Sequence, residues 1–249
     1  MESLDNKRVH EIELDMLSEL NRISKRHKIK YYLAYGTALG AVRNNGFIPW
    51  DTDVDVIVEY NNTKKLDEIL SKELSGKYRV LNYKNDSSSP LMFSRIVLAN
   101  DDGVTVHVDL FPMVGLPNRK IKQQIFIKTA RIVNALFFFK KVEPEKYYTD
   151  RNKKIRLSKI LKVVSKPFPI RMLIWAKEKM ANKYIIKESR YLFNLCGAYG
   201  KKEIIPKGWL DEPVYKQFET ESLPLPKEYD KYLTHIYGDY MIPKKDEYI

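Results

Sequence analysis

The sequence has a single cysteine, Cys196, among its 249 residues. One cysteine excludes a disulfide within the chain and a cluster of thiolate metal ligands, and it agrees with a reducing compartment. The sequence also lacks an apolar run that could cross a bilayer, because the strongest candidate, residues 132–139, is short and contains Asn134. The first seventeen residues mix acidic and basic side chains without an apolar stretch, so we expect no signal peptide there. These absences predict a cytoplasmic protein.

Acidic residues are scarce in one part of the chain. Residues 119–190 contain 21 Lys and Arg against 5 Asp and Glu, whereas the remainder contains 23 against 27. A basic segment of this kind predicts an anionic partner. The sequence has no zinc-finger spacing, aromatic RNA-binding signature or helix-turn-helix pattern, so we expect no nucleic-acid partner. The segment is then either a solvated helical layer or a face that lies on anionic lipid, with residues 137–139, Phe168 and Trp175 in the interface.

Hydrophobic periodicity predicts an α+β protein. Period-two and β-branched patterns favour strands, and apolar residues spaced three and four apart favour helices. The predicted strands are 31–35, 54–60, 78–83, 91–98 and 104–111, and the predicted helices are 4–26, 37–43, 64–74, 120–140, 153–164 and 170–191. The chain therefore divides into a core at 1–118, a basic helical segment at 119–196, and a loop-rich C-terminal region at 197–249 that packs back on the core.

Three aspartates, Asp51, Asp53 and Asp55, are spaced by two residues just before and at the start of the second predicted strand. On a strand, this spacing places their side chains on one face, about 7 Å apart. Clustered like charges need a compensating cation, and Mg²⁺ or Mn²⁺ held by one or two carboxylates plus substrate phosphates is the usual solution. A solvated acidic turn is the alternative. A calcium loop of the EF-hand kind is excluded, because Val56 and Asn62 stand where it needs Gly and Glu.

Two further features point to the same chemistry. Asp109 follows His107 on a later strand, and it becomes a third ligand if that strand lies beside residues 54–60, because adjacent strands are about 4.8 Å apart. Gly36 and Thr37 form a strand-to-helix turn, where a glycine and free helix N–H groups can receive a phosphate. An ordinary capped turn is the alternative. Together these features suit a nucleotide polyphosphate with its metal.

This arrangement resembles the nucleotidyltransferase fold, in which a Gly-Ser turn precedes an Asp-x-Asp strand and a third acid follows. The stretch GTALGAVRNNGFIPWDTDVDV at 36–56 further resembles the signature of the LicD family, and HVDLFP at 107–112 and YGDYMIP at 237–243 resemble its later motifs. The departures are Thr52, where a further aspartate is common, and Lys244, where a second proline is usual. The resemblance implies a mixed β-sheet core flanked by helices.

The resemblance also implies an activity. Members of the family are similar to bacterial phosphocholine transferases and, more distantly, to fukutin-related ribitol-phosphate transferases. We therefore expect transfer of a phospho-alcohol, above all phosphocholine, from a CDP-alcohol to a sugar hydroxyl of a cell-surface glycan precursor, with release of CMP. The acceptor is expected to be lipid-linked, with the enzyme at the inner face of the cell membrane. A nucleotidyltransferase, a metal-dependent glycosyltransferase and a lipid-binding adaptor are the rival functions.

Roles follow for individual residues. Asp53, Asp55 and Asp109 are expected to hold Mg²⁺ or Mn²⁺, and Asp51 is expected to be a further ligand or, preferably, the base that takes the sugar hydroxyl proton. The remaining residues expected at the substrate are Gly36, Thr37, Arg43, Trp50, Tyr237, Asp239 and Tyr240.

Overall fold

The central sheet brings together strands from distant parts of the chain. The computed structural model describes residues 5–100, 106–143 and 154–242. Five strands lie in the order β1 (Tyr31–Leu33), β2 (Val54–Glu59), β5 (His107–Gly115), β4 (Ser94–Leu98) and β3 (Tyr78–Leu81). β2 and β5 are parallel, and the other neighbouring pairs are antiparallel. β6 (Tyr191–Asn194) pairs with the C-terminal end of β5, and β7 (Ile204–Pro206) pairs with β6.

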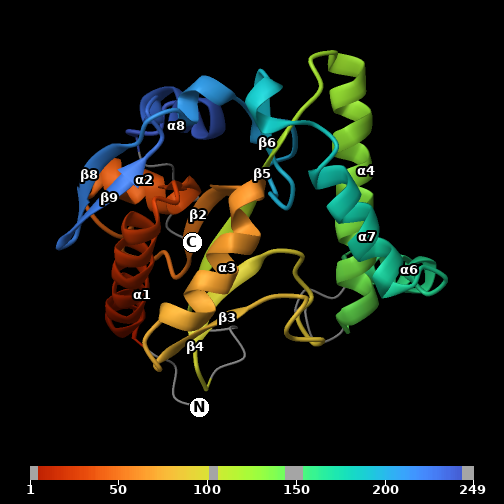
Figure 1. Ribbon diagram of the computed structural model, residues 1–249. Helices are drawn as coiled ribbons and strands as arrows, with labels where there is room; N and C mark the ends of the chain where they lie inside the picture. The colour runs from red at the N-terminus through yellow and green to blue at the C-terminus, as the bar shows by residue number, and fades with distance from the viewer. Residues whose placement is uncertain (1–4, 101–105, 144–153, 243–249) are drawn as a thin grey trace.

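Helices flank this sheet, as Figure 1 shows. They are α1 (Asn6–His27), α2 (Tyr35–Arg43), α3 (Tyr60–Glu73), α4 (Lys120–Lys141), α6 (Lys154–Ser165), α7 (Ile170–Ala181) and α8 (Tyr229–Tyr237). The hairpin of β8 (Val214–Phe218) and β9 (Glu221–Leu225) lies near α1 and α2, and three 3₁₀ turns occur at Ile186–Glu188, Gly200–Glu203 and Lys207–Leu210. The α+β class and the mixed sheet are confirmed.

The main core lies between the sheet and the helices of the N- and C-terminal regions. The apolar stripe of α1, which includes Met16, Leu20 and Ile23, is fully buried there, and so are Val54 and Val56 of β2. Two smaller apolar clusters lie beneath α4 and α7. One is centred on Phe126 and the other on Phe137, and both of these residues belong to α4. In Figure 1, α4, α6 and α7 stand together on one side of the molecule. In the described residues, no helix is both long enough and apolar enough to span a membrane.

Several predicted boundaries differ from the structure, and the differences that matter most for the site are these. The helix predicted at 170–191 ends at Ala181, where the Asn182 side chain bonds the Glu178 carbonyl at 2.8 Å, and residues 191–194 are the strand β6. α3 begins at Tyr60, one turn before the predicted start, so β2 ends at Glu59. Only the third aspartate, Asp55, lies in β2, because Asp51 and Asp53 precede it. The C-terminal region contains the β8–β9 hairpin and α8, so it is more regular than expected.

Candidate functional site

The pairing of β2 with β5 sets two carboxylates side by side. In this parallel register Asp55 lies opposite Asp109. The condition set for Asp109, that its strand lies beside residues 54–60, is therefore met. Because side chains alternate along a strand, Asp55 and Asp109 share one face of the sheet, and Val56 and Leu110 share the other.

Arg95 and His107 surround Asp109, which is only 5% exposed. Arg95 lies opposite Asp109 on β4, with its Nε 2.5 Å from Oδ1 and its Nη2 donating to Oδ2 at 3.1 Å. His107 Nε2 lies 3.7 Å from Oδ1. Burial raises the pKa of Asp109 to about 6, against the opposing effect of Arg95. Burial and then Arg95 lower the pKa of His107 to about 4, so this imidazole is neutral at pH 7.

Gly36 makes room for the carboxylate of Asp51. A Cβ atom at Gly36 would lie 2.4 Å from Asp51 Oδ2. The backbone carbonyl of Asp51 lies 2.6 Å from Nε2 of His10, whose ring stacks on Phe47. Burial, followed by the hydrogen bond and charge of Asp53, raises the pKa of Asp51 to about 7. A carboxyl group with this pKa can exchange protons near neutral pH.

Thr37 connects helix α2 to strand β2. Its hydroxyl accepts a hydrogen bond of 2.9 Å from the backbone N–H of Asp55, and the residue is 5% exposed. Thr37 therefore fixes the backbone that carries Asp55. Two residues before Thr37, Tyr35 has the left-handed φ of 46°, which turns the chain from β1 into α2.

A fifth acidic residue, from helix α1, joins the four aspartates. Glu13 of α1 is fully buried, and neither of its carboxylate oxygens makes a well-formed hydrogen bond among the described residues. Burial, then the charges of Asp53 and Asp51, raise its pKa to about 8, and a weak contact from the His107 backbone offsets part of this shift. The sequence analysis missed Glu13, although it occupies the apolar stripe of α1, four residues after Val9 and four before Leu17.

The acidic cluster has excess negative charge in its ionised form. Burial, followed by the charges of Asp53, Asp109 and Asp51, raises the pKa of Asp55 well above its ordinary value, and the charge of Arg95 opposes this rise. No three Asp, Glu, His or Cys side chains of the described chain already have the arrangement of a metal site. The residues instead fit an ion held by two carboxylates plus substrate oxygens, which is how proteins usually bind Mg²⁺. Asp53 is exposed and Asp55 half-buried, so both can reach such an ion.

Aromatic side chains from three parts of the chain border the same cluster. Tyr35 and Tyr199 are stacked with centroids 5.3 Å apart, and Tyr199 meets Tyr237 edge-on at 6.1 Å. The charge of Asp55 contributes to raising the pKa values of both Tyr199 and Tyr237, after the larger effect of burial. The hydroxyl of Tyr35 donates to Glu203 and accepts from Asn194 at 2.7 Å. Tyr237 was predicted at the substrate, whereas Tyr199 and Tyr35 were not.

The other predicted substrate residues lie around α2 and the C-terminal end of the described chain. Arg43 Nη1 lies 3.5 Å from the Tyr240 carbonyl, so it joins α2 to the C-terminal motif. Tyr240 is 8% exposed and donates to Asp230 at 2.6 Å, which agrees with a packing role. Asp239 is exposed, and Trp50 is 41% exposed. The last residue of that motif, Pro243, and Lys244 lie outside the described residues.

Comparison with known proteins places this site in a family. The family model described as "LicD/FKTN/FKRP, nucleotidyltransferase domain" matches residues 28–144, which include all four aspartates. The chain is 26% identical over 249 aligned residues to the lipopolysaccharide cholinephosphotransferase LicD of Haemophilus influenzae, covering 94% of this chain and 91% of the relative. An uncharacterised protein of Rickettsia typhi is 30% identical over 69 residues, which is 28% of this chain and 21% of that one.

Among solved structures, the crystal structure of ANT(2″)-Ia in complex with adenylyl-2″-tobramycin aligns with a TM-score of 0.30 and 11% identity, over 61% of this chain and 96% of that one. This likeness is too loose to say anything about function. The family domain and the near full-length relative agree with the mixed sheet and with the nucleotidyltransferase-like core that the sequence predicts. The chain therefore belongs to the LicD family of phosphotransferases, and residues 28–144 carry the family's nucleotidyltransferase domain.

Proposed function

We propose that this protein transfers phosphocholine from CDP-choline to a hydroxyl group of a cell-surface glycan and releases CMP. The observation that carries the proposal is the register of Asp55 opposite Asp109, in a chain that aligns over 94% of its length with a lipopolysaccharide cholinephosphotransferase. The clustered carboxylates suit a phosphate-bound divalent ion, and the neighbouring tyrosines suit a quaternary ammonium group, which binds to aromatic faces.

Asp53 and Asp55 would hold Mg²⁺ or Mn²⁺, with Asp109 as a third ligand where Arg95 releases it. Such an ion, when bound, neutralises charge on the diphosphate. Asp51 accepts the proton of the sugar hydroxyl as the new oxygen–phosphorus bond forms and the bond between phosphocholine and CMP breaks. Its pKa of about 7 matches this role. Thr37 holds the Asp55 backbone in place, and Gly36 leaves room for the Asp51 carboxylate.

Tyr199 and Tyr237 are proposed to contact the choline group. They lie beside Asp55, and Tyr199 is 44% exposed, so its ring is accessible to a ligand. A cation over a tyrosine face gains about 0.5–2 kcal/mol, depending on how far it is desolvated. This contact distinguishes CDP-choline from CDP-ribitol and CDP-glycerol, which carry no cation.

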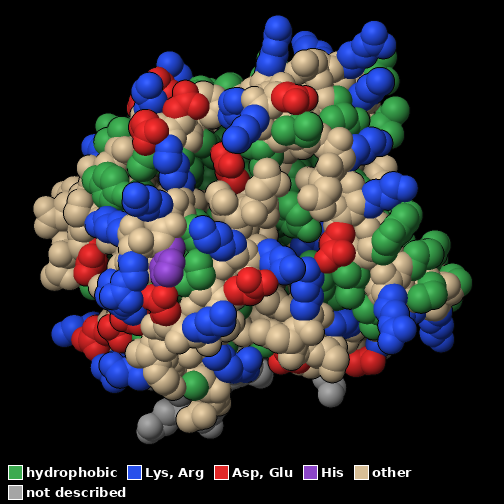
Figure 2. All heavy atoms as spheres, in the orientation of Figure 1, with side chains coloured by type: hydrophobic (Ala, Val, Ile, Leu, Met, Phe, Trp, Pro, Cys, Tyr) green, Lys and Arg blue, Asp and Glu red, His purple; other side chains and the backbone are tan. Residues whose placement is uncertain are grey.

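The exposed face of α4, α6 and α7 is proposed to contact anionic lipid, which would bring the enzyme to a lipid-linked acceptor. On α4, Ile121, Ile125 and Ile132 are 76%, 60% and 58% exposed, although Phe137, predicted at this interface, is wholly buried. Val163 of α6 and Trp175 of α7 are 61% and 58% exposed. Figure 2 shows Lys and Arg side chains interspersed with apolar ones on this side of the molecule. An interfacial helix combines these two kinds of residue.

The test begins with thermal stabilisation by CDP-choline, CDP-ribitol, CDP-glycerol, CTP and UDP-sugars, each with and without Mn²⁺. We expect a metal-dependent rise in Tm with CDP-choline, because a ligand that binds only the folded state stabilises it by mass action. CMP release with purified lipopolysaccharide as acceptor then measures turnover. Asp53→Asn and Asp55→Asn should abolish it, whereas Asp86→Asn, in a loop remote from the cluster, should not.

Two outcomes would refute the proposal. Near wild-type turnover in Asp53→Asn or Asp55→Asn would exclude these carboxylates from the reaction. Stabilisation by CTP alone, with nucleoside rather than phosphocholine attached to the acceptor, would favour the nucleotidyltransferase reaction that the family domain's name suggests.

A further inference from the structure

A cavity lies on the face of the sheet opposite the aspartates. It has a volume of about 840 Å³, and its lining includes Val58 of β2, Ser94 of β4 and Leu110 of β5. Ser94 and Leu110 are register partners, and the next pair along the two strands is Arg95 and Asp109. Because side chains alternate along a strand, Ser94 and Leu110 lie on the face opposite Asp109. The sheet itself therefore separates this cavity from the acidic cluster. Its volume is in the range of small-molecule sites.

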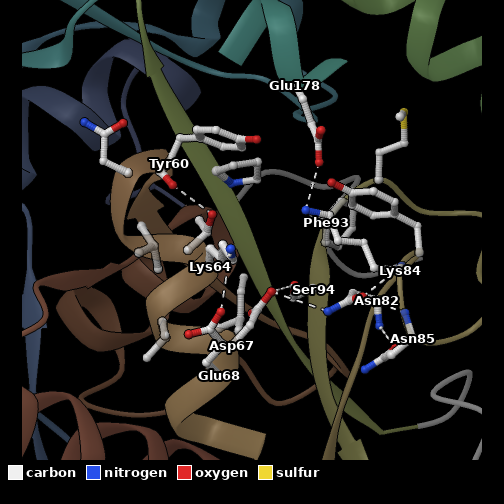
Figure 3. Close-up of a pocket in the computed structure, with 18 of the residues that line it drawn as sticks. Tyr60, Lys64, Asp67, Glu68, Asn82, Lys84, Asn85, Phe93, Ser94 and Glu178 are labelled. Atoms are coloured by element: carbon white, nitrogen blue, oxygen red, sulfur yellow. Dashed lines mark hydrogen bonds and ion pairs between the residues drawn. The ribbon is translucent and has the colours of Figure 1, made fainter. Parts of the chain in front are cut away.

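The walls of the cavity come from three segments, as Figure 3 shows. α3 supplies Tyr60, Lys64, Asp67 and Glu68, the loop after β3 supplies residues 82–85, and α7 supplies Lys177 and Glu178. The loop is fixed by its own hydrogen bonds, because Asn82 Oδ1 accepts the backbone N–H groups of Lys84 and Asn85 at 2.9 and 3.1 Å. The site is thus formed before any ligand arrives.

Lys177 is the unusual residue of this lining. It is 3% exposed, yet it makes no ion pair with a carboxylate within the described chain. Its Nζ lies 4.6 Å from the centroid of Tyr83, and it also interacts with the thiol of Cys196, whose pKa burial raises. The carboxylates of Asp67 and Glu178 also act on its charge, but neither forms an ion pair with it within the described chain. A buried ammonium group of this kind is costly unless an anion compensates it, and burial accordingly lowers its pKa.

Most of the other charged side chains of the lining already have partners among the lining residues. Lys84 is bound to Glu178 at 2.8 Å, and Lys64 approaches Glu68 at 3.9 Å. Asp67 accepts a hydrogen bond of 2.7 Å from Ser94 through Oδ2. Its other oxygen can accept from a ligand hydroxyl. With Asn61, Asn82 and Asn85, the cavity therefore offers a buried cation that forms no ion pair among the described residues, the exposed Lys72, and a set of neutral donors and acceptors.

We propose that this cavity is a second binding site, distinct from the acidic cluster, for a phosphorylated sugar. The phosphate pairs with Lys177, and the sugar hydroxyls bond to Asp67 and the asparagine side chains of the rim. Apolar Leu66, Leu110 and Pro112 provide a surface for the carbon faces of the ring. The proposal does not depend on phosphocholine transfer.

The test is titration calorimetry of the full chain, without CDP-choline, using glucose 6-phosphate, glucose and inorganic phosphate as probes. We expect saturable binding of glucose 6-phosphate that is tighter than either fragment. Lys177→Met should weaken it about tenfold or more, the loss typical of one charge-assisted hydrogen bond. Lys179→Met is the matched control, because Lys179 lies on the same helix above Trp175 and does not line the cavity.

Two further variants keep the result interpretable. Asn61→Trp obstructs the cavity from an exposed position on α3, so it tests the site even if Lys177→Met does not fold. Asp55→Asn should leave this binding unchanged while it abolishes phosphocholine transfer, which separates failure of this site from failure of the proposed reaction. The proposal would be overturned if glucose 6-phosphate did not bind at millimolar concentration, or if inorganic phosphate alone bound with equal affinity. It would also be overturned if binding survived both Lys177→Met and Asn61→Trp, or if binding were lost in Asp55→Asn.

Discussion

Glu13→Gln should change how the stability of the metal-free protein depends on pH. Burial raises the pKa of Glu13 from an ordinary 4.5 to about 8. A group whose folded-state pKa is raised contributes stability that is fully present below its unfolded pKa and is lost as pH rises through its folded pKa. Glutamine has nearly the same shape but does not titrate, so the variant should lack this loss.

The magnitude follows from the size of the shift. Each pH unit between the two pKa values changes the free energy of unfolding by up to about 1.4 kcal/mol. Between pH 5 and pH 8 the wild type should therefore lose about 3–4 kcal/mol more than Glu13→Gln. At pH 5 the variant should be the less stable protein, because its buried amide donors lack acceptors, at a cost of roughly 1–3 kcal/mol. The two stability curves should then cross between pH 5 and pH 8.

The assay is urea unfolding of both proteins in EDTA at unit steps from pH 5 to pH 8. The difference between the two proteins reports the titration of Glu13 together with its coupling to Asp51 and Asp53, whereas the titration that the two proteins share cancels. Glu11→Gln is the control, since Glu11 lies on the exposed side of α1, paired with Arg8 at 2.9 Å, and should leave the profile unchanged. Parallel curves for wild type and Glu13→Gln would refute the burial of an uncompensated carboxyl group at this position.

Three further predictions test the site and its surroundings. Gly36→Ala should keep its Tm, because the new methyl group meets only the movable tip of the Asp51 side chain, but it should lose CMP release. In contrast, Gly40→Ala should lose roughly 1–3 kcal/mol of stability, because its Cβ would lie 2.4 Å from the backbone carbonyl oxygen of Gly46. Tyr199→Leu should raise KM for CDP-choline without an equal change for CDP-glycerol, measured by CMP release, and Tyr199→Phe should restore it; equal changes for both donors would exclude choline recognition. Trp175→Ala should weaken flotation with anionic vesicles at low salt but leave the Tm unchanged, and full recovery with the vesicles would count against the lipid-facing surface.

Much of the fold could be predicted because local patterns agree with the tertiary structure. The β-branched run at 54–60 became β2, and the alternating pattern before Phe111 became part of β5. Residues 191–194 could not be assigned in this way. Leu192 and Phe193 are apolar in a pattern that also suits a helix, and only their pairing with β5, far away in the sequence, makes them a strand.

For the candidate site too, the sequence predicted the residues that have a local pattern and missed those that only the fold brings together. The alternating aspartates and the Gly36-Thr37 turn were local signals. The structure brings Asp55 beside Asp109, which meets the condition set for Asp109 but could not be known from the sequence. Arg95 and Tyr199 have no local signal, because an arginine on a strand or a tyrosine in a loop is ordinary until the fold brings it to the aspartates. Glu13 did leave a signal, namely an acid within the apolar stripe of a helix, and such a position can be searched for in other sequences.

The strand β5 has a consequence for how the chain reaches its native state during synthesis. On one edge, its first half pairs with β4 and its last residues, Met113 to Gly115, pair with β6. β4 precedes β5 in the chain, but β6 follows it after α4, α6 and α7 have been made. On the ribosome, the end of β5 therefore waits with an open edge until residues 191–194 emerge, and such edges readily pair with other chains. A truncation that stops before residue 191 would leave the nucleotidyltransferase domain, otherwise complete in sequence, with that edge permanently exposed.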